Sequence, residues 1–445
     1  MAGIRLSTPR LKKMPELLPQ TSDLSLLNDY LYQLGRNAKA AYNDASRATP
    51  AQRVNVLHDL AKKLLADKKA ILKENRKDLR LAQTKRLAPQ LVDRLELDHN
   101  RFTAMVEGVQ QVAALPDPVG NIRALESRPS GIRVGKMRVP LGVIVMIYES
   151  RPNVTIDAAT LNMRVGNAVI LRGGSESFNT NMALNNSIKA ALQSAGLPQT
   201  LVQLVEHTNR EAVSTLVQMD DCVDLVIPRG GRELIQRVMQ ASRVNLLKHL
   251  DGNCHIYVDT KANLNMAKEL VLNAKTRRYG VCNALESLLV ASPVAKEFFA
   301  TGVAEELMQA GVKIHACAKS LPLLSGENLL PAREKDWSTE YLGPDLSLKL
   351  VDGLETAITH INQYGSHHTD AIVTDSLEHS KAFLRRVDSS SVMVNASTAF
   401  ADGFEYGLGA EIGVSTDKFH ARGPVGLEGL TSEKYIVLGH GETRP

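Results

Sequence analysis

The stretch Leu141-Gly142-Val143-Ile144-Val145-Met146-Ile147 is a continuous apolar run in the first half of the chain. A run of this kind, without polar alternation, is typical of a strand that is buried on both faces of a parallel sheet. A helical segment over 155–163 follows, and a second buried strand is predicted at Ala168–Leu171. The order of strand, helix and strand recurs through 201–205 and 223–227. These repeated βαβ units predict a doubly wound α/β domain.

Two of these strands end in a glycine pair that carries an arginine and opens a helix. The first pair lies in Arg172-Gly173-Gly174-Ser175 and the second in Pro228-Arg229-Gly230-Gly231. Helix N-termini at the carboxyl ends of parallel strands favour phosphate, glycine permits close backbone approach, and arginine adds a planar donor fork. The alternative for each pair is a simple chain turn. Both pairs together favour a dinucleotide pocket, although no G-x-G-x-x-G follows the first strand.

A cysteine stands directly after a glycine and an apolar residue in Arg277-Arg278-Tyr279-Gly280-Val281-Cys282-Asn283. Arginines lower the pKa of a thiol and hold anions, and the thiolate is the nucleophilic form. The alternative is a buried structural cysteine, and the segment alone leaves both interpretations open. A second α/β segment surrounds it, with a helix predicted over 266–275 and strands at 256–258, 288–290, 371–374 and 392–395.

Helical patterns and a hairpin frame these two segments. Apolar residues recur at helical spacing from Leu24 to about Gln110, and Thr49-Pro50 is a plausible helix cap and first turn. Alternation with a period of two over Arg128–Val139 predicts a β-hairpin. Lys434–Leu438 is a lone strand, for which the alternatives are pairing with this hairpin or with another subunit.

Composition excludes several classes of function. The chain of 445 residues has a net charge of +5 and 4% aromatic residues, so nucleic-acid binding is not expected. No stretch approaches about eighteen uncharged apolar residues, so no membrane span is expected. Four sparse cysteines without a C-x-x-C pair favour a reducing compartment and argue against a metal site. We expect a cytoplasmic protein in which residues 1–22 are an N-terminal extension; a transit peptide is the alternative.

Several blocks, taken together and in order, resemble the γ-glutamyl phosphate reductase branch of the aldehyde dehydrogenase superfamily. The resemblance covers about residues 30–440. It rests on the blocks Tyr148–Thr155, Leu171–Glu176, Ile227–Gly231, His249–His255, Gly280–Ala284, Gly365–Asp370 and Gly423–Glu428. It implies an NADP-dependent reduction that releases phosphate, in proline biosynthesis.

Carried over by motif, the resemblance also implies roles for individual residues. Cys282 is similar to the superfamily's catalytic thiol, and backbone N–H groups with the Asn283 side chain are candidate oxyanion donors. Arg172 takes the place of a lysine that meets the adenosine ribose or its phosphate. Pro228–Gly231 matches the turn beside the nicotinamide, and Glu340 matches a glutamate that holds the nicotinamide ribose. Candidates for the substrate phosphate or carboxylate are Arg277, Arg278, His367 and His368, for which solvated ion pairs and loop caps are the alternatives.

The implied architecture is aldehyde-dehydrogenase-like, with two doubly wound α/β domains and a small β oligomerisation flap. The cofactor domain is expected to comprise 23–126, 141–252 and 399–430, the catalytic domain 253–398, and the flap 127–140 and 431–445. We accordingly expect a homo-oligomer that binds NADPH or NADP, L-glutamyl 5-phosphate and phosphate. The resemblance also implies glutamate 5-kinase as a functional partner.

Two positions depart from the wider pattern. Hydrolytic aldehyde dehydrogenases use a glutamate to activate water, and His249 stands at that position here. An enzyme that exchanges its thioester with phosphate needs no such water, and His249 is either a phosphate contact or structural. The second departure is Ala399, which follows Asn395–Thr398 where the reductase pattern has arginine. Loss of that charge removes a charge-assisted contact and predicts weaker substrate binding or turnover.

The mechanism implied by the resemblance is covalent. The Cys282 thiolate attacks the γ-carbonyl of L-glutamyl 5-phosphate, phosphate leaves, and NADPH reduces the thioester to L-glutamate 5-semialdehyde. The nearest alternative is a hydrolytic NAD(P)-dependent aldehyde dehydrogenase, against which the missing glutamate argues. A non-catalytic dinucleotide-binding protein is the alternative from a different class, favoured by Ala399 and opposed by the intact segment around Cys282.

Overall fold

A computed structural model describes residues 24–444, so the predicted N-terminal extension lies outside the described residues. The chain begins with a helical layer, in which Thr49 caps the longest helix. The Thr49 hydroxyl accepts a hydrogen bond from the Gln52 N–H, and the Gln52 side chain accepts one from the Thr49 N–H. This reciprocal box confirms the predicted cap. The layer consists of α1 (Leu24–Ala45), α2 (Pro50–Thr84), α3 (Pro89–Leu95) and α4 (His99–Ala114).

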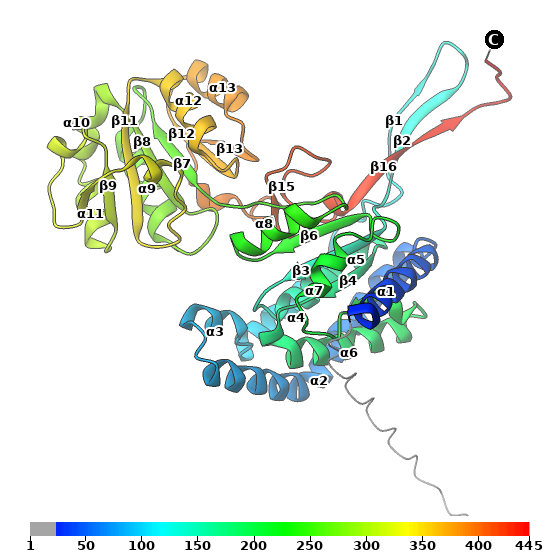
Figure 1. Cartoon of the computed structure of the whole chain (residues 1–445). Coiled ribbons are helices and arrows are strands. Elements are labelled where there is room, and N and C mark those ends of the chain that lie inside the picture. Colours follow the sequence, from blue (N-terminus) through cyan, green and yellow to red (C-terminus); the bar gives the residue numbers. More distant parts are fainter. Residues whose placement is uncertain (1–23, 445) are drawn as a thin grey trace, which may run out of the picture.

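The first sheet contains four parallel strands in the order β5-β4-β3-β6. Every residue of β3 and β4 is buried, which confirms the two predicted core strands. In Figure 1, α2 lies beside α6 below this sheet. The strands are β3 (Val143–Tyr148), β4 (Ala168–Arg172), β5 (Val202–Leu204) and β6 (Leu225–Arg229), and the helices between and after them are α5 (Asn153–Val165), α6 (Phe178–Ser194), α7 (Glu211–Leu216) and α8 (Arg232–Ala241).

The second sheet contains seven parallel strands in the order β10-β9-β11-β8-β7-β12-β13. Figure 1 shows it as a separate body above the first sheet, with helices on both faces. Its strands are β7 (Cys254–Val258), β8 (Leu285–Ala291), β9 (Lys313–Ala316), β10 (Leu329–Pro331), β11 (Asp345–Val351), β12 (Thr369–Val373) and β13 (Ser391–Val394). Its helices are α9 (Leu264–Thr276), α10 (Ala295–Phe299), α11 (Val303–Gln309), α12 (Leu354–Tyr364) and α13 (Leu377–Arg386).

A third, antiparallel sheet projects away from both bodies (Figure 1). It joins β1 (Ile122–Ser127), β2 (Arg133–Pro140) and β16 (Thr431–Leu438) in that order. The C-terminal strand therefore pairs with the predicted hairpin, whose first strand begins at Ile122 rather than near residue 128. The short strands β14 (Val414–Ser415) and β15 (Gly423–Pro424) form a separate pair. Within residues 24–444, no helix is both long and apolar enough to cross a bilayer.

Candidate active site

Four neighbouring strands of the second sheet bring their preceding loops to one edge. In the order β11-β8-β7-β12 the strands are parallel, so their amino-terminal ends lie side by side. Glu340 lies in the loop before β11, Cys282 before β8, His249 before β7, and His368 directly before β12. The fold thus gathers four of the predicted site residues at the amino ends of adjacent strands.

Gly252 allows two of these loops to touch. A Cβ atom built on Gly252 would lie 2.1 Å from the backbone oxygen of Cys282, so no larger residue fits without a shift. The Gly252 N–H donates to Oε1 of Glu340 at 2.8 Å. Burial raises the pKa of Glu340, whereas this N–H and the nearby His368 lower it. Gly252 therefore links the thiol loop to the predicted ribose-binding glutamate.

Cys282 is partly exposed and faces two histidines. One ligand atom each from His249, Cys282 and His368 lies within 4.8 Å of the others. The rings of His249 and His368 meet edge to face with centroids 5.5 Å apart. The Nδ1 atom of His249 lies 3.1 Å from the Val414 carbonyl oxygen, which makes Nδ1 the donor in a neutral ring and leaves Nε2 with a lone pair. A thiol with imidazole acceptors beside it is suited to nucleophilic catalysis, and the three groups also match the ligands that zinc prefers.

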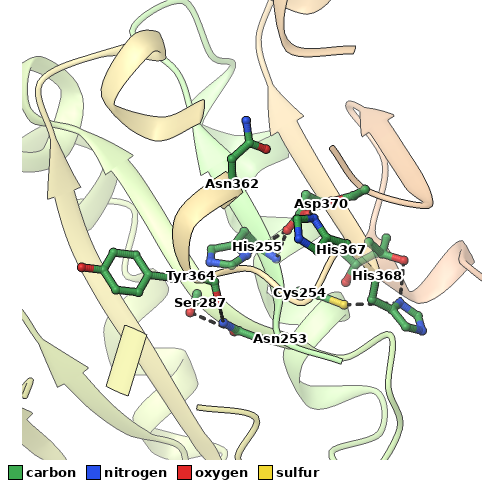
Figure 2. A network of polar contacts seen from close by, with 12 residues as sticks. Asn253, Cys254, His255, Ser287, Asn362, Tyr364, His367, His368 and Asp370 are labelled. Carbon is green, nitrogen blue, oxygen red and sulfur yellow. Dashed lines mark hydrogen bonds and ion pairs between the residues drawn. The ribbon is translucent and has the colours of Figure 1, made fainter. Parts of the chain in front are cut away.

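His368 is held as a neutral, buried imidazole. Burial lowers the pKa of His368 to about 4, and its Nε2 has no hydrogen-bond partner among the described residues. Its Nδ1 lies 2.9 Å from the Thr369 hydroxyl. Figure 2 shows the same ring beside the sulfur of Cys254. His367 makes different contacts: its Nδ1 lies 2.6 Å from the Asp388 carbonyl oxygen. The structure therefore brings His368, and not His367, into the Cys282 cluster.

Cys254 supports the site without taking part in nucleophilic chemistry. Its thiol donates to the Cys282 carbonyl oxygen at 3.2 Å, and burial raises its pKa well above the usual value. Beneath it, Nδ1 of His255 lies 2.8 Å from Oδ1 of Asp370 in a fully buried pair that joins β7 to β12 (Figure 2). Cys254 is therefore a buried structural thiol.

A buried ion pair anchors the loop that carries Cys282. Lys275, near the end of α9, lies 2.7 Å from Glu286 in β8, and both side chains are fully buried. The other Glu286 oxygen accepts a hydrogen bond from the Leu342 N–H at 3.1 Å. Burial raises the pKa of Glu286 to about 7, with Lys275 acting in the opposite direction. The pair thus joins the two ends of the thiol loop, and Glu286 connects them to the loop that carries Glu340. This role was not predicted from the sequence.

The side-chain amide of Asn283 donates both of its hydrogen bonds to the loop that contains Ala399 and Ala401. Its Nδ2 donates to the carbonyl oxygens of Ala399 and Ala401, each at 3.2 Å. Its own carbonyl oxygen accepts from the Thr398 hydroxyl at 2.8 Å. An amide has two N–H bonds, and both are occupied here. Both donors of the Asn283 side chain are engaged in this geometry, so its role as an oxyanion donor stays a prediction, and the backbone N–H groups beside Cys282 are the unengaged candidates that we favour.

The two glycine pairs flank β3. Arg172 ends β4 opposite Ile147, and Arg229 ends β6 opposite Tyr148. Because β4 and β6 lie on either side of β3, the pairs face the point where the strand order reverses, which is where doubly wound sheets bind ligands. The structure therefore brings Arg172–Ser175 and Pro228–Gly231 to the same edge of the first sheet.

The residues at this edge fit an anionic dinucleotide. Arg172 is buried and donates to the carbonyl oxygens of Gly173, Thr208 and Asn209, but its Nε has no partner among the described residues. Burial lowers the pKa of Arg172. At the second pair, the Gly231 N–H donates to Glu149 at 2.9 Å. Ser175 is exposed at the start of a short 3-10 turn.

Two arginines precede the thiol, and one of them lines a cavity. Arg277 and Arg278 are both exposed. Arg278 contributes to the wall of a cavity of about 360 Å³, together with Arg151. Burial, and then repulsion from Arg229, Arg94 and Arg278, lowers the pKa of Arg151 to about 10, while Cys282 acts in the opposite direction. Arg151 belongs to a motif block on which the resemblance rests, but no role follows from the sequence alone.

Comparison with known proteins supports the resemblance. Residues 31–314 match the model of the aldehyde dehydrogenase family. The γ-glutamyl phosphate reductase from Thermotoga maritima is 40% identical, with a TM-score of 0.91, and the match covers 93% of this chain and 100% of that one. The reductase of the same name from Saccharomyces cerevisiae is 33% identical, with a TM-score of 0.52 and coverage of 93% and 98%.

A more distant solved structure shares the fold. An engineered glycolyl-CoA reductase with bound NADP⁺ is 15% identical, with a TM-score of 0.63 and coverage of 92% of this chain and 96% of that one. At this identity only the fold is shown, and it agrees with the predicted α/β architecture of parallel sheets. The chain belongs to the aldehyde dehydrogenase family and, within it, to the γ-glutamyl phosphate reductases.

Proposed function

We propose that the chain catalyses the NADPH-dependent reduction of L-glutamyl 5-phosphate to L-glutamate 5-semialdehyde with release of phosphate, in proline biosynthesis. The observation that carries the proposal is the arrangement of Cys282, partly exposed and within 4.8 Å of two imidazoles, in a chain 40% identical to a γ-glutamyl phosphate reductase. The proposal includes glutamate 5-kinase as the partner that supplies the substrate, and a cytoplasmic location.

Cys282 acts as the nucleophile. Its thiol proton passes to a neutral imidazole, for which the Nε2 lone pair of His249 is the acceptor. The thiolate attacks the γ-carbonyl carbon, the bond from that carbon to the phosphate oxygen breaks, and phosphate leaves with the electron pair. Backbone N–H groups beside Cys282 stabilise the oxyanion because the Asn283 amide is occupied. When bound, NADPH supplies the hydride that reduces the resulting thioester.

The cofactor is proposed to lie between the two glycine pairs and the thiol. Arg172, with Gly173, Gly174 and Ser175, would hold the adenosine ribose phosphate, and the unpartnered Nε of Arg172 supports this assignment. The turn from Pro228 to Gly231 would lie beside the nicotinamide. Glu340 would hold the nicotinamide ribose. It lies near the thiol loop, because it accepts a hydrogen bond from Gly252, whose Cα approaches the backbone of Cys282.

Phosphate, rather than water, is proposed to accept the acyl group in the reverse reaction. His249 and His368 are the titratable groups clustered with Cys282, and Glu340 is bonded to a backbone N–H. A neutral imidazole that is bonded to a backbone carbonyl leaves one lone pair, which suits transfer of the thiol proton. What supports a phosphate-releasing enzyme over the hydrolytic alternative is the missing glutamate at position 249, where hydrolytic enzymes hold their base.

The domain boundaries and the oligomer are also proposals. The cofactor domain would comprise 23–126, 141–252 and 399–430, the catalytic domain 253–398, and the flap 127–140 and 431–445; β1, which begins at Ile122, would extend the flap by a few residues. The outer edge of β16 exposes Tyr435 (71%), Val437 (57%) and Leu438 (49%). An exposed apolar edge strand of this kind is a template for pairing between subunits. Removal of residues 431–445 should therefore lower the oligomeric state in solution, as light scattering would show.

The proposed activity is tested by NADP⁺ reduction with L-glutamate 5-semialdehyde, with and without inorganic phosphate. We expect activity that requires phosphate and that is lost in Cys282→Ala. Cys254→Ala is the matched control because that thiol is buried beside the site, and it should retain activity. Activity without phosphate would assign the chain to the hydrolytic class instead.

A further inference from the structure

A charged cavity lies between the first sheet's helical layer and the loop that carries Cys282. Its volume is about 360 Å³, which is within the range of small-molecule sites. α3, α4, the beginning of α5 and the segment before Cys282 each contribute to its wall. The charged and polar side chains of this wall are Asp93, Arg94, Glu96, Arg101, Arg151, Asn153, Asp157 and Arg278.

The four arginines of this wall outnumber its three carboxylates, which are those of Asp93, Glu96 and Asp157. Arg101 is paired with Asp93 at 2.6 Å. No ion pair within residues 24–444 includes Arg151 or Arg278, and the pKa of Arg151 is lowered by burial and by the other guanidinium groups. A partly buried cation beside other cations, as Arg151 is here, is costly unless an anion neutralises it. The cavity therefore favours a ligand with a carboxylate or phosphate.

Among the acidic residues of this wall, Asp157 is the partly buried one. Asp157 lies on α5 and accepts a hydrogen bond from the Asn153 side chain at 2.9 Å. Asp157 belongs to no ion pair within the described residues, and burial raises its pKa to about 6 although Arg229 acts in the opposite direction. A half-buried carboxylate without a cation is suited to a ligand ammonium group. Arg151 and Asp157 thus present opposite charges to one small space.

We propose that this cavity binds the α-amino acid end of the substrate, with Asp157 receiving the α-ammonium group and Arg151 the α-carboxylate. The proposal rests on the proposed function and extends it, because it names the residues that select an amino acid over a simple aldehyde. Arg278 lines the same cavity four positions before Cys282, and Cys282 raises the pKa of Arg151, so the cavity lies beside the thiol loop. The two residues are binding residues and take no part in bond breaking.

The test compares three aldehydes in the phosphate-dependent oxidation. L-Glutamate 5-semialdehyde carries both groups, 5-oxopentanoate lacks the ammonium group, and 4-aminobutanal lacks the carboxylate. We expect Asp157→Asn to lower kcat/KM for the first aldehyde by about 10- to 100-fold and to leave 5-oxopentanoate within about 3-fold, since only the first makes the charged contact. Arg151→Gln should lower kcat/KM about 10-fold more for the first aldehyde than for 4-aminobutanal.

Asp352→Asn is the matched control for the carboxylate change, because Asp352 is exposed at the surface of the second body and pairs only loosely with Lys319 at 3.4 Å. Asp352→Asn should leave kcat/KM unchanged for all three aldehydes. Arg151→Lys keeps the charge and should restore part of the loss seen in Arg151→Gln. Equal effects of Asp157→Asn on glutamate semialdehyde and 5-oxopentanoate would overturn the proposal.

A binding measurement separates this proposal from the proposed function. Titration calorimetry with L-glutamate and with glutarate requires no turnover. We expect the wild type to bind L-glutamate more tightly than glutarate and Asp157→Asn to lose that preference. A wild type that binds with this preference but oxidises none of the aldehydes would contradict the proposed function alone. A wild type that oxidises glutamate semialdehyde but shows no preference would contradict the assignment of Asp157.

Discussion

The Nδ2 atom of Asn283 donates to the backbone oxygen of Ala399 at 3.2 Å, which ties the residue after the thiol to the position that departs from the reductase pattern. The bond is made to the backbone, so it does not depend on the side chain at position 399. Ala399 itself is half-buried, and the next residue, Phe400, is exposed. The loop beside Cys282 therefore keeps its shape with alanine, and what is lost is a charge near the site.

Ala399→Arg should therefore improve substrate use without changing stability. A new charge-assisted contact to a substrate anion is worth roughly a tenfold increase in kcat/KM, and a half-exposed substitution changes the free energy of unfolding by less than about 0.5 kcal/mol. Steady-state kinetics and urea unfolding measure the two effects. Ala399→Gln is the control of similar size without charge; an equal gain in that variant would show that charge is not the cause.

Breaking the buried pair behind the thiol loop should be costly. Lys275→Met leaves Glu286 buried without its cation, and such a change costs about 3–5 kcal/mol of the free energy of unfolding. Urea unfolding near about pH 8 would show it, and the cost should shrink in acid, where Glu286 becomes neutral. Replacing both partners by apolar residues should recover most of the loss. The exposed pair of Lys77 and Glu74 supplies the control, since Lys77→Met should cost less than about 0.5 kcal/mol.

Asp157→Asn should stabilise the fold while it weakens catalysis. The folded state raises the pKa of Asp157 from 3.8 to about 6, so the ionised form is disfavoured in the native protein. The wild type consequently loses stability as the pH rises from about 4 to about 6, by about 1–3 kcal/mol. The variant should be more stable than the wild type near about pH 8 and equal to it near about pH 3. A less stable variant at the higher pH would indicate that Asp157 supports the fold.

Zinc should inhibit the enzyme reversibly. His249, Cys282 and His368 offer two imidazoles and a thiolate, and the low pKa of His368 keeps its ring neutral and able to bind metal. Inhibition should strengthen as the pH rises, because metal binding competes with protons, and chelator should reverse it. Magnesium is the control, since it prefers oxygen ligands. His249→Gln should weaken zinc inhibition at least about tenfold; unchanged inhibition would mean that zinc binds the thiol without the histidines.

Local sequence patterns predict the core of this fold well. The apolar runs of β3 and β4 predict buried strands, and both strands are fully buried in the structure. The two glycine pairs predict strand ends, and the strands that they end, β4 and β6, are the two neighbours of β3. β11 was not predicted, although Asp345–Val351 alternates polar and apolar residues as a strand does, and most of the strand is buried. Alternation normally indicates a strand with one face exposed to solvent. Here β11 lies inside the sheet between β9 and β8, and most of its residues are buried.

The site was harder to predict because its parts come from separate loops. No spacing in the sequence relates His249 or His368 to Cys282; the order of β8, β7 and β12 in the sheet brings them together. A buried glutamate inside the apolar strand Leu285–Ala291 was the available signal for the pair with Lys275. Asp157 gave no signal, since a single acid on a helix usually faces solvent.

The central claim is that Cys282 carries a thioester that phosphate, and not water, discharges. The direct measurement is peptide mass spectrometry of the enzyme after incubation with L-glutamate 5-semialdehyde and NADP⁺ in the absence of phosphate. We predict a glutamyl adduct on the peptide that contains Cys282, which persists until phosphate is added and then disappears. Release of free glutamate without phosphate, or an adduct absent from Cys282, would contradict the account.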